Sequence, residues 1–458
     1  MAIESQEFFK VHPAVFHLFD RPSYIPDAIS DKLCEKYGEA VLTSALEAWK
    51  QLIEDHLPTP LPFTENDIID CYCNAPITTV NLLVSYQCNM ACSYCYSEEV
   101  LRQPGGVSLM SSEIAFAAVD YFLESSLKQG FAKVTFKFSG GGEPLMNREI
   151  VHKTILYAQN HRLRDQVEVQ FKLSTNGILL DTETIAFFKD QPMELKISID
   201  GCKEIHQRRR FSKSGQDNYK KLLENISLAL TELSPKRVVA AVTISDPARL
   251  QEILNFLLDI GFRRIRTQKA IGPSIQAPST DKETSSTSSQ LFHEYYKTIK
   301  KFQEKNLSED SWPSFESIDL FIEGLNRQQN KRHLACNAGI YDCTVAPDGT
   351  IYSCNRFAGD PTHLMGDVFN GIDRGWQDKF CRASNLFNRS KCLDCWLIYW
   401  CGGNCNYQNQ VETNNMLESS EESCASMKTF FEHAIWFYCK LRRDDPEILK
   451  KIVSRKVF

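Results

Sequence analysis

The sequence predicts an α/β protein: a partial (β/α)6 barrel that follows a small N-terminal helical module and precedes a cysteine-rich C-terminal domain. Three observations predict this fold. Strand-like apolar runs alternate with amphipathic helical segments from Thr78 to about Ala270, as in a parallel sheet whose strands are joined by helices. Residues 1–77 show mainly helical patterns. Cysteines gather after about residue 333, where secondary-structure signals weaken.

The N-terminal module is predicted over residues 1–77. Apolar residues at helical spacing predict helices over 27–37 and 40–55, separated by Gly38, whereas "VFHLF" is only a hint of a strand. The proline-rich stretch "LPTPLPF" then separates this module from the barrel.

The barrel is predicted over residues 78–270, with helices near 111–127, 216–233 and 248–260. In such barrels the chemistry lies in the loops that follow the carboxyl ends of the strands. The strand-like runs are "TTVNLLVS", "KVTFKFS", "VEVQFKLS", "ELKISID", "RVVAAVTI" and "RRIRTQ".

Three further segments follow the barrel. Residues 271–289, rich in Ser, Thr and Pro, predict a flexible linker or lid within a region of linker and bridging helices over 271–332. A small domain over 333–430 is expected to be organised by metal more than by an apolar core. A helix from roughly Cys424 to Arg443 and a tail close the chain, which places the last segment at 431–458.

Composition excludes several functional classes. A hydrophobic content of 43% and a charged content of 24% are ordinary for a soluble globular protein. The net charge of −6 argues against binding to nucleic acid or to an anionic membrane. With no membrane-spanning run and a polar start, "MAIESQEFFKVH", we expect a cytoplasmic protein. The cytosol keeps thiols reduced, so 17 cysteines indicate metal or cluster ligation in preference to disulfides.

The stretch "SYQCNMACSYCYSEEV" places Cys88, Cys92 and Cys95 in the loop after the first predicted strand. Three thiolates at C-x3-C-x2-C suit a cubane [4Fe–4S] cluster with one iron left without a protein ligand. Such an open iron is a place for chemistry, as is the open position of a catalytic zinc. A zinc site or three core thiols would be the alternative.

This spacing, with an aromatic residue before the third cysteine, resembles the signature of the radical S-adenosylmethionine (radical SAM) enzymes. The resemblance implies that the open iron binds S-adenosylmethionine, whose cleavage gives methionine and a 5′-deoxyadenosyl radical that abstracts a substrate hydrogen. The motifs "SGGGEP", "LSTNG" and "KISIDGCKEIHQRRRF" follow the next three strands and extend the resemblance. The cofactor-binding residues that it implies are Tyr94, Gly141, Gly142, Glu143, Pro144, Ser174, Asn176, Ser198, Asp200 and Arg210.

Two of these residues have distinct implied roles. The Glu143 loop would hold the amino group of the cofactor, since a carboxylate suits an ammonium. Arg210 would hold its carboxylate, because a guanidinium pairs with a carboxylate in two parallel hydrogen bonds. His206 is a candidate catalytic residue, and a bond to Asp200 or to a backbone carbonyl would make it structural instead.

The cysteine-rich region resembles the SPASM domain of peptide-modifying radical enzymes. Its frame is C-x12-G-x4-C with one more cysteine, Cys343, inside the first interval, then C-x2-C-x5-C-x3-C, then a last cysteine. These eight cysteines suffice for two fully ligated [4Fe–4S] clusters, three clusters in all; two structural zinc ions are the alternative. By resemblance, the first auxiliary cluster would take Cys336, Cys343, Cys354 and Cys405. The second would take Cys392, Cys395, Cys401 and Cys424.

The resemblance covers roughly residues 78–430 and implies a radical enzyme acting on a peptide or protein, with an electron donor such as flavodoxin or ferredoxin. Three activities compete: crosslinking of a ribosomally made peptide through a thioether or carbon–carbon bond, formylglycine formation by an anaerobic sulfatase-maturating enzyme, and maturation of a quinone cofactor or amine dehydrogenase. A non-catalytic, metal-stapled binding protein is the hypothesis from another class, but it would not need these motifs at successive strand ends.

Asn355 helps to choose between these activities. Sulfatase maturases carry an aspartate, the proposed general base, directly after the cysteine equivalent to Cys354. Asn355 occupies that position here, and an amide cannot usefully accept a proton. Asn355 is therefore a candidate catalytic position with altered chemistry, and we expect a crosslinking peptide maturase whose N-terminal leader-binding module is shortened or degenerate.

Overall fold

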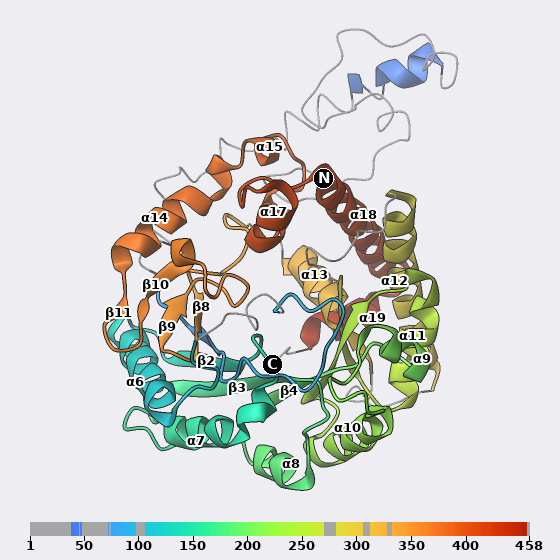
Figure 1. The fold of residues 1–458 in the computed structure, drawn as a ribbon. Helices are drawn as coiled ribbons and strands as arrows, with labels where there is room; N and C mark the ends of the chain where they lie inside the picture. The colour runs from blue at the N-terminus through green and yellow to red at the C-terminus, as the bar shows by residue number, and fades with distance from the viewer. Residues whose placement is uncertain are drawn as a thin grey trace.

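The computed structural model describes residues 38–44, 46–47, 72, 75–97, 106–269, 281–305, 312–327 and 332–455. In this part of the chain one curled sheet has the spatial order β11-β10-β9-β8-β1-β2-β3-β4-β5-β6-β7 (Figure 1). Strands β1 to β7 pair in parallel, and β8 joins β1 in parallel. Strands β8 to β11 pair antiparallel. The strands are β1 (Thr79–Leu82), β2 (Lys133–Phe138), β3 (Glu168–Thr175), β4 (Met193–Ser198), β5 (Val238–Ile244), β6 (Arg264–Lys269), β7 (Ser314–Phe315), β8 (Asp342–Val345), β9 (Thr350–Tyr352), β10 (Leu364–Asp367) and β11 (Gly371–Ile372).

Each predicted strand-like run overlaps one of the strands β1 to β6, and no strand extends more than one residue beyond its run. The predicted parallel α/β fold is therefore confirmed. Strand alternation explains how the sheet has two different faces. In β3, Phe171 and Leu173 are buried, whereas Lys172 and Ser174 are half-buried. The first pair packs in the core against the helices, and the second pair therefore faces the inside of the barrel.

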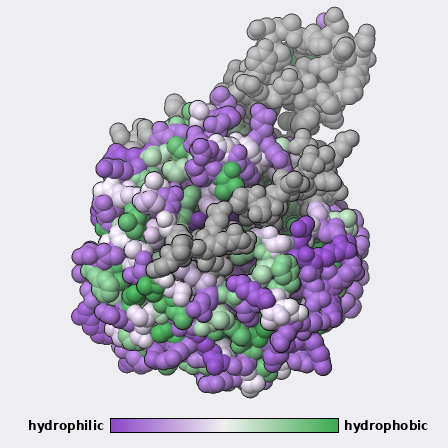
Figure 2. Space-filling model, in the orientation of Figure 1, coloured by the Kyte–Doolittle hydropathy of each residue, from purple (hydrophilic) through white to green (hydrophobic). Residues whose placement is uncertain are grey.

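Helices cover the outer face of the sheet and ring the molecule (Figure 1). Phe122 of α6, Ile155 of α7, Ile185 of α8 and Leu222 of α10 belong to the same buried cluster as the strands. Hydrophilic side chains cover most of the described face in Figure 2, with apolar residues in small groups between them. The α-helices are α6 (Ser112–Lys128), α7 (Arg148–Gln159), α8 (Thr182–Lys189), α9 (Lys203–Arg209), α10 (Tyr219–Leu233), α11 (Leu250–Asp259), α12 (Asp281–Glu304), α13 (Glu316–Arg327), α14 (Arg374–Ser384), α15 (Ser390–Leu393), α16 (Ile398–Cys401), α17 (Asn406–Thr413), α18 (Glu421–Asp444) and α19 (Pro446–Ser454).

The expectation of a flexible linker over 271–289 is wrong from Asp281 onward, where α12 begins. Residues 270–280 lie outside the described part of the chain. Helix α12 packs against α18, with the ring centroid of Phe292 5.3 Å from that of Phe430 and 5.6 Å from that of Phe437. This tertiary packing stabilises a helix whose Ser- and Thr-rich start has low helix propensity.

The C-terminal region shares the core of the barrel, contrary to the expectation of a domain organised more by metal. Strand β8 extends the barrel sheet, with Cys343 opposite Val80. Ile351 and Met365 belong to the same buried cluster as the barrel residues. The predicted boundary between 430 and 431 falls inside α18, which contains the predicted helix over 424–443.

Little of the predicted N-terminal module lies within the described residues. Residues 39–44 and 46–47 are helical, inside or next to the predicted helix over 40–55. The predicted helix over 27–37 lies outside the described residues. Among the described helices, none combines the length and the apolar character that a bilayer crossing requires.

Candidate active site

The three-cysteine loop follows β1 at the carboxyl end of the sheet. Burial raises the pKa of Cys92 to about 11; Arg210 opposes this shift, and the nearby thiols of Cys95 and Cys88 add to it. Burial also raises the pKa of Cys88. Buried thiols of this kind become thiolates only where a bound cation compensates for the burial of charge. Among the described residues, no three His, Cys, Asp or Glu side chains are arranged closely enough to hold a metal ion. The three thiols of the loop are nevertheless the donor type that iron–sulfur clusters use.

Residues 209–213, here called the strap, run antiparallel beside the cysteine loop. The Ala91 N–H donates to the Phe211 carbonyl at 2.8 Å, and the Ser93 N–H donates to the Arg209 carbonyl at 2.9 Å. These bonds flank the second cysteine of the loop. The strap therefore fixes the backbone on both sides of that ligand position.

The glycine-rich loop after β2 presents Glu143 as a buried carboxylate, only 3% exposed. Its Oε1 accepts bonds from the Thr175 hydroxyl at 2.6 Å and the Leu145 N–H at 3.1 Å, and its Oε2 accepts the Asn176 N–H at 2.7 Å. Burial raises the pKa of Glu143, and these donors partly reverse the shift. Since a carboxylate oxygen can accept two hydrogen bonds, Oε2 keeps room for an ammonium donor.

Gly142 brings this loop against the cysteine loop. Its N–H donates to the Ser85 carbonyl at 2.8 Å. A Cβ atom at Gly142 would lie 2.0 Å from the Gln87 carbonyl oxygen, so no other residue fits. Gly141 has a φ of +64°, and Pro144 begins the short 3-10 helix η1 (Pro144–Asn147).

The loop after β3 is tied to the cysteine loop by a residue that the sequence analysis did not select, Asn89. The Asn176 Nδ2 donates to the Asn89 Oδ1 at 2.7 Å, and the Asn176 Oδ1 accepts the Ile178 N–H at 3.1 Å. Asn176 thus positions the loop instead of projecting freely. Ser174 and Ser198 are half-buried on inward-facing positions of β3 and β4.

Tyr94, Asp200 and Arg210 form one buried hydrogen-bonded group. The Tyr94 hydroxyl donates to Asp200 Oδ2 and accepts from Arg210 Nε. Arg210 Nε also lies 3.1 Å from Asp200 Oδ2, and Asp200 Oδ1 accepts the Thr243 N–H at 3.0 Å. Among the described residues, no hydrogen bond involves the two terminal nitrogens of Arg210. These nitrogens remain available for the carboxylate of a ligand.

His206 has a structural contact. Its Nδ1 accepts the Asp200 N–H at 3.3 Å, and its ring is 4% exposed. Burial, with the charge of Arg210, lowers the pKa of His206 to about 4. The imidazole is therefore neutral at pH 7, with its proton on Nε2.

The C-terminal cysteines lie in two groups. Burial and the neighbouring thiols of Cys405 and Cys354 raise the pKa of Cys336 to about 12. Burial and Asp342 raise the pKa of Cys343, which lies on β8. Three of the four residues predicted for the first auxiliary cluster, Cys336, Cys354 and Cys405, thus influence one another electrostatically. The fourth, Cys343, follows Asp342, which also acts on Cys336.

The second group contains all four residues predicted for the other auxiliary cluster. Burial raises the pKa of Cys392 to about 11, and the thiols of Cys401, Cys424 and Cys395 add to this shift. Burial raises the pKa of Cys424 as well, and the thiols of Cys401 and Cys395 add to this shift. The thiol of Cys424, near the start of α18, thus lies near those of Cys392 on α15 and Cys401 on α16.

Asn355, in the C-terminal region, contacts the end of the cysteine loop and the loop after β2. Its Nδ2 donates to the Tyr96 hydroxyl at 2.5 Å, and its Oδ1 accepts from Cys354 Sγ at 3.4 Å. A Cβ atom on Gly140 would lie 2.5 Å from Asn355 Nδ2. Both polar atoms of the amide are thus engaged beside the predicted cofactor loop.

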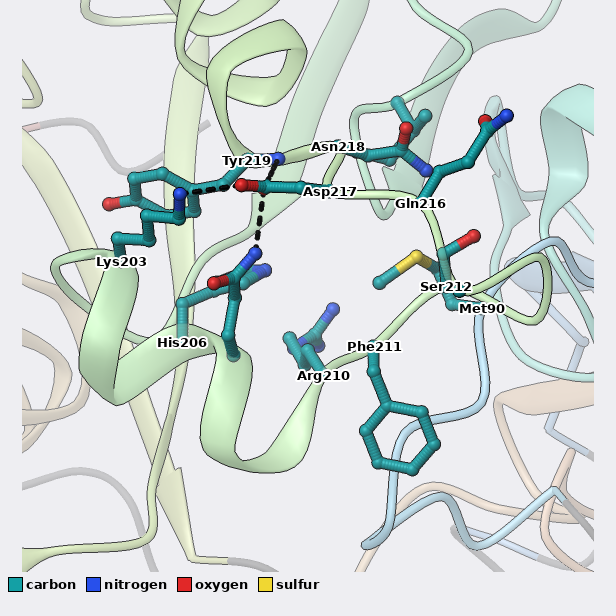
Figure 3. A pocket seen from close by; sticks show the side chains of 13 residues that line it. Met90, Lys203, His206, Arg210, Phe211, Ser212, Gln216, Asp217, Asn218 and Tyr219 are labelled. Atoms are coloured by element: carbon teal, nitrogen blue, oxygen red, sulfur yellow. Dashed lines mark hydrogen bonds and ion pairs between the residues drawn. The ribbon is translucent and has the colours of Figure 1, made fainter.

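A cavity of about 210 Å³ lies beside this site and is not the predicted cofactor site (Figure 3). It shares His206 and Arg210 with the site but is lined by none of the cysteines and not by Glu143. On its far side, Lys203 Nζ lies 2.5 Å from Asp217 Oδ2.

The inside of the barrel holds a buried ionic network that the sequence analysis did not identify. Arg264 of β6 donates to Glu194 of β4 at 2.7 Å and to Glu316 of α13 at 2.5 Å. Lys196, two residues below Ser198, has its pKa lowered to about 8, mainly by burial. Only the alternation of inward positions, every second residue of β4 and β6, could have indicated this cluster.

Comparisons with known proteins agree with this geometry. Residues 82–239 match the model of the Radical SAM superfamily. The chain is 22% identical to a cysteine-type anaerobic sulfatase-maturating enzyme of Clostridium novyi, over 77% of this chain and 93% of that protein. It is 20% identical to the radical SAM cyclopropyl synthase TigE of Paramaledivibacter caminithermalis, over 78% of this chain and 74% of that protein.

Solved structures show the same fold. The chain superposes on anSMEcpe with bound AdoMet with a TM-score of 0.68 and 19% identity, covering 82% of this chain and 98% of that one. For Streptococcus suis SuiB bound to its precursor peptide SuiA, the TM-score is 0.53 at 13% identity, covering 87% and 83%. The barrel and its C-terminal extension are thus one known architecture.

Proposed function

We propose that this chain is a radical SAM enzyme built around residues 82–239, which match the Radical SAM superfamily, and that it oxidatively modifies a ribosomally made peptide, forming a thioether or carbon–carbon crosslink. The observation that carries the proposal is the convergence of four strand-end elements on one place: the cysteine loop, the Glu143 loop, Asn176, and the Tyr94–Asp200–Arg210 group. Relatives and structural neighbours that act on peptides support the choice of substrate class.

The residues at these strand ends fit S-adenosylmethionine and one [4Fe–4S] cluster. Cys88, Cys92 and Cys95 would ligate the cluster, Glu143 would accept bonds from the cofactor ammonium, and the terminal nitrogens of Arg210 would bind its carboxylate. Bound there, the cofactor supplies a carbon radical able to break a strong carbon–hydrogen bond. The chain itself binds and orients the cofactor, and the buried hydrogen bonds around Glu143 and Asp200 hold these groups in place before binding.

We further propose that the two C-terminal cysteine groups hold auxiliary [4Fe–4S] clusters, about twelve irons per chain in all. The second cluster is supported by the proximity of its four predicted ligands: the thiols of Cys395, Cys401 and Cys424 each raise the pKa of Cys392. The first would need Cys343 or a non-cysteine ligand to complete Cys336, Cys354 and Cys405. Such clusters would accept the second electron of the oxidation or bind a substrate thiolate, in a cytoplasmic enzyme reduced by a flavodoxin or ferredoxin.

Asn355 favours crosslinking over formylglycine formation. Its Nδ2 donates to the Tyr96 hydroxyl, and an amide does not take up a proton at neutral pH. The position where sulfatase maturases carry aspartate therefore holds no general base here. Sulfatase maturation remains the second candidate because four curated relatives have that activity.

The test compares two substrates under dithionite with S-adenosylmethionine. A peptide encoded beside the gene should give a product lighter by two hydrogens, measured by mass spectrometry. Formylglycine in a cysteine-containing sulfatase peptide, with no product from the neighbouring peptide, would select the second candidate. An intact cofactor in both reactions would contradict both.

A further inference from the structure

The outer face of the strap carries an unusual set of side chains. The strap runs from Arg209, the last residue of α9, to a turn at Lys213. The side chains of Arg209, Phe211 and Lys213 are exposed, whereas Arg210 is 9% exposed and points into the site. Phe211 itself is 49% exposed. In Figure 3 its ring points away from the Lys203–Asp217 side of the cavity. The strap thus carries an exposed aromatic ring that is flanked in the sequence by two exposed cations.

Within the described part of the chain, neither Arg209 nor Lys213 makes an ion pair. The neighbouring cations differ: Lys203 pairs with Asp217 at 2.5 Å, and Arg208 pairs with Glu204 at 2.6 Å. The chain as a whole has a net charge of −6 and repels an anionic partner. Arg209 and Lys213 can attract such a partner locally.

This face lies directly behind the cysteine loop. The Lys213 N–H donates to the Asn89 carbonyl at 3.1 Å, and the strap carbonyls of Arg209 and Phe211 bind the loop on both sides of Cys92. A partner bound to the strap would therefore be separated from the cysteine loop only by the backbone of the strap.

We propose that the strap is the docking surface of an acidic one-electron carrier of the flavodoxin type, which reduces the cluster at the cysteine loop. This rests on the proposed function, because it assumes that cluster. In the step the carrier loses one electron and the cluster gains it, and no bond is made or broken. Phe211 supplies an apolar anchor, and Arg209 and Lys213 orient the acidic rim of the carrier around it.

The test measures binding first. The dissociation constant between the anaerobically purified enzyme and an acidic flavodoxin is determined by isothermal titration at low and high salt. Arg209→Glu and Lys213→Glu should each weaken binding about tenfold at low salt, an effect that salt screens. Phe211→Ser should weaken it at both salt concentrations. Lys128→Glu is the matched control, since it makes the same charge change on α6, across the barrel from α9 (Figure 1), and it should bind as wild type.

Cofactor cleavage separates this proposal from the proposed function. Arg209→Glu and Lys213→Glu should lose flavodoxin-driven cleavage at least fivefold yet keep dithionite-driven cleavage, because a small reductant needs no docking surface. Unchanged flavodoxin affinity in both variants would overturn the docking surface. If the wild-type enzyme does not cleave S-adenosylmethionine with dithionite, the proposed function is overturned instead.

Discussion

Asn355 donates to the Tyr96 hydroxyl at 2.5 Å, although 259 residues separate them in the chain. The bond joins the turn after Cys354 to the end of the cysteine loop. It therefore holds the C-terminal region and the predicted cofactor site in a fixed relation, beside a glycine that admits no side chain.

Replacing Asn355 should show that this amide is a structural link. Asn355→Leu removes the amide donor from the buried Tyr96 hydroxyl and should lower the free energy of unfolding by about 1–3 kcal/mol. Asn355→Asp should lose less, because the Tyr96 hydroxyl can donate to the new carboxylate. Denaturant unfolding under anaerobic conditions measures both, and equal stability of Asn355→Leu and wild type would contradict the link.

The cysteine loop predicts a contrast between two thiols. Cys88→Ala should abolish formation of methionine and 5′-deoxyadenosine and lower the iron content, because a ligand is lost. Cys202→Ala should keep both, since Cys202 Sγ contacts Glu252 at 3.4 Å and lies outside the loop. Iron analysis and chromatography of the cleavage products provide the readout; retained cleavage in Cys88→Ala would refute the ligand assignment.

A cysteine of the second C-terminal group should behave differently. Cys395→Ala should spare uncoupled cofactor cleavage but lose the modified peptide, because it leaves the cysteine loop intact. Circular dichroism verifies that the variant is folded. If peptide product forms at the wild-type rate, the auxiliary site has no part in the reaction.

Gly142 should be irreplaceable for a steric reason. In Gly142→Ala the new Cβ would lie 2.0 Å from the Gln87 carbonyl oxygen, so the Glu143 loop must move away from the cysteine loop. S-adenosylmethionine affinity, measured by equilibrium dialysis, should fall at least tenfold. Gly106→Ala is the control, because a Cβ there meets nothing within 4 Å; an equal loss in both variants would count against the steric explanation.

The ionic network inside the barrel predicts a large stability effect. Arg264→Met leaves Glu194 and Glu316 without their shared cation and should cost about 3 kcal/mol, the low end for a broken buried pair, because Lys172, Lys196 and Arg266 still lie near these carboxylates. Arg162→Met removes an exposed pair with Glu124 and should change stability little. Urea unfolding of the two variants tests the difference.

His206 predicts a pH dependence. Its folded pKa of about 4 lies below the usual 6.5, so the unfolded chain binds the proton more readily and stability falls as the pH drops from about 6.5 towards 4. Between pH 7 and 5.5 this amounts to about 1 kcal/mol. His206→Gln should lose that part of the pH dependence. Deuterium exchange at the imidazole C2 position measures the pKa directly, and a pKa near 6.5 would contradict the buried, neutral state.

How much could be predicted from the sequence differs between local and distant features. Strands β1 to β6 and helices α6, α10 and α11 follow from apolar periodicity, since the side chains that must be buried are already spaced along the chain. Helix α12 could not be predicted from its Ser- and Thr-rich start, because its stability comes from contacts with α18, more than a hundred residues away in the sequence. The same holds for β8, which joins the barrel sheet only because β1 offers a free edge.

The sequence by itself determined the chemistry of the site: three thiols at a spacing that suits one cluster, a glycine-rich loop with its glutamate, and eight further cysteines in a fixed order. These features are local, and the identity and spacing of the residues carry them. Only the tertiary structure decided that Asn176 bonds to Asn89, that Asn355 bonds to Tyr96 and that His206 is held by Asp200. It also decided that Arg209 and Lys213 of the strap are exposed and make no ion pair with any other described residue. Each of these contacts joins separate loops, and the packing of the barrel, not the spacing along the chain, brings those loops together.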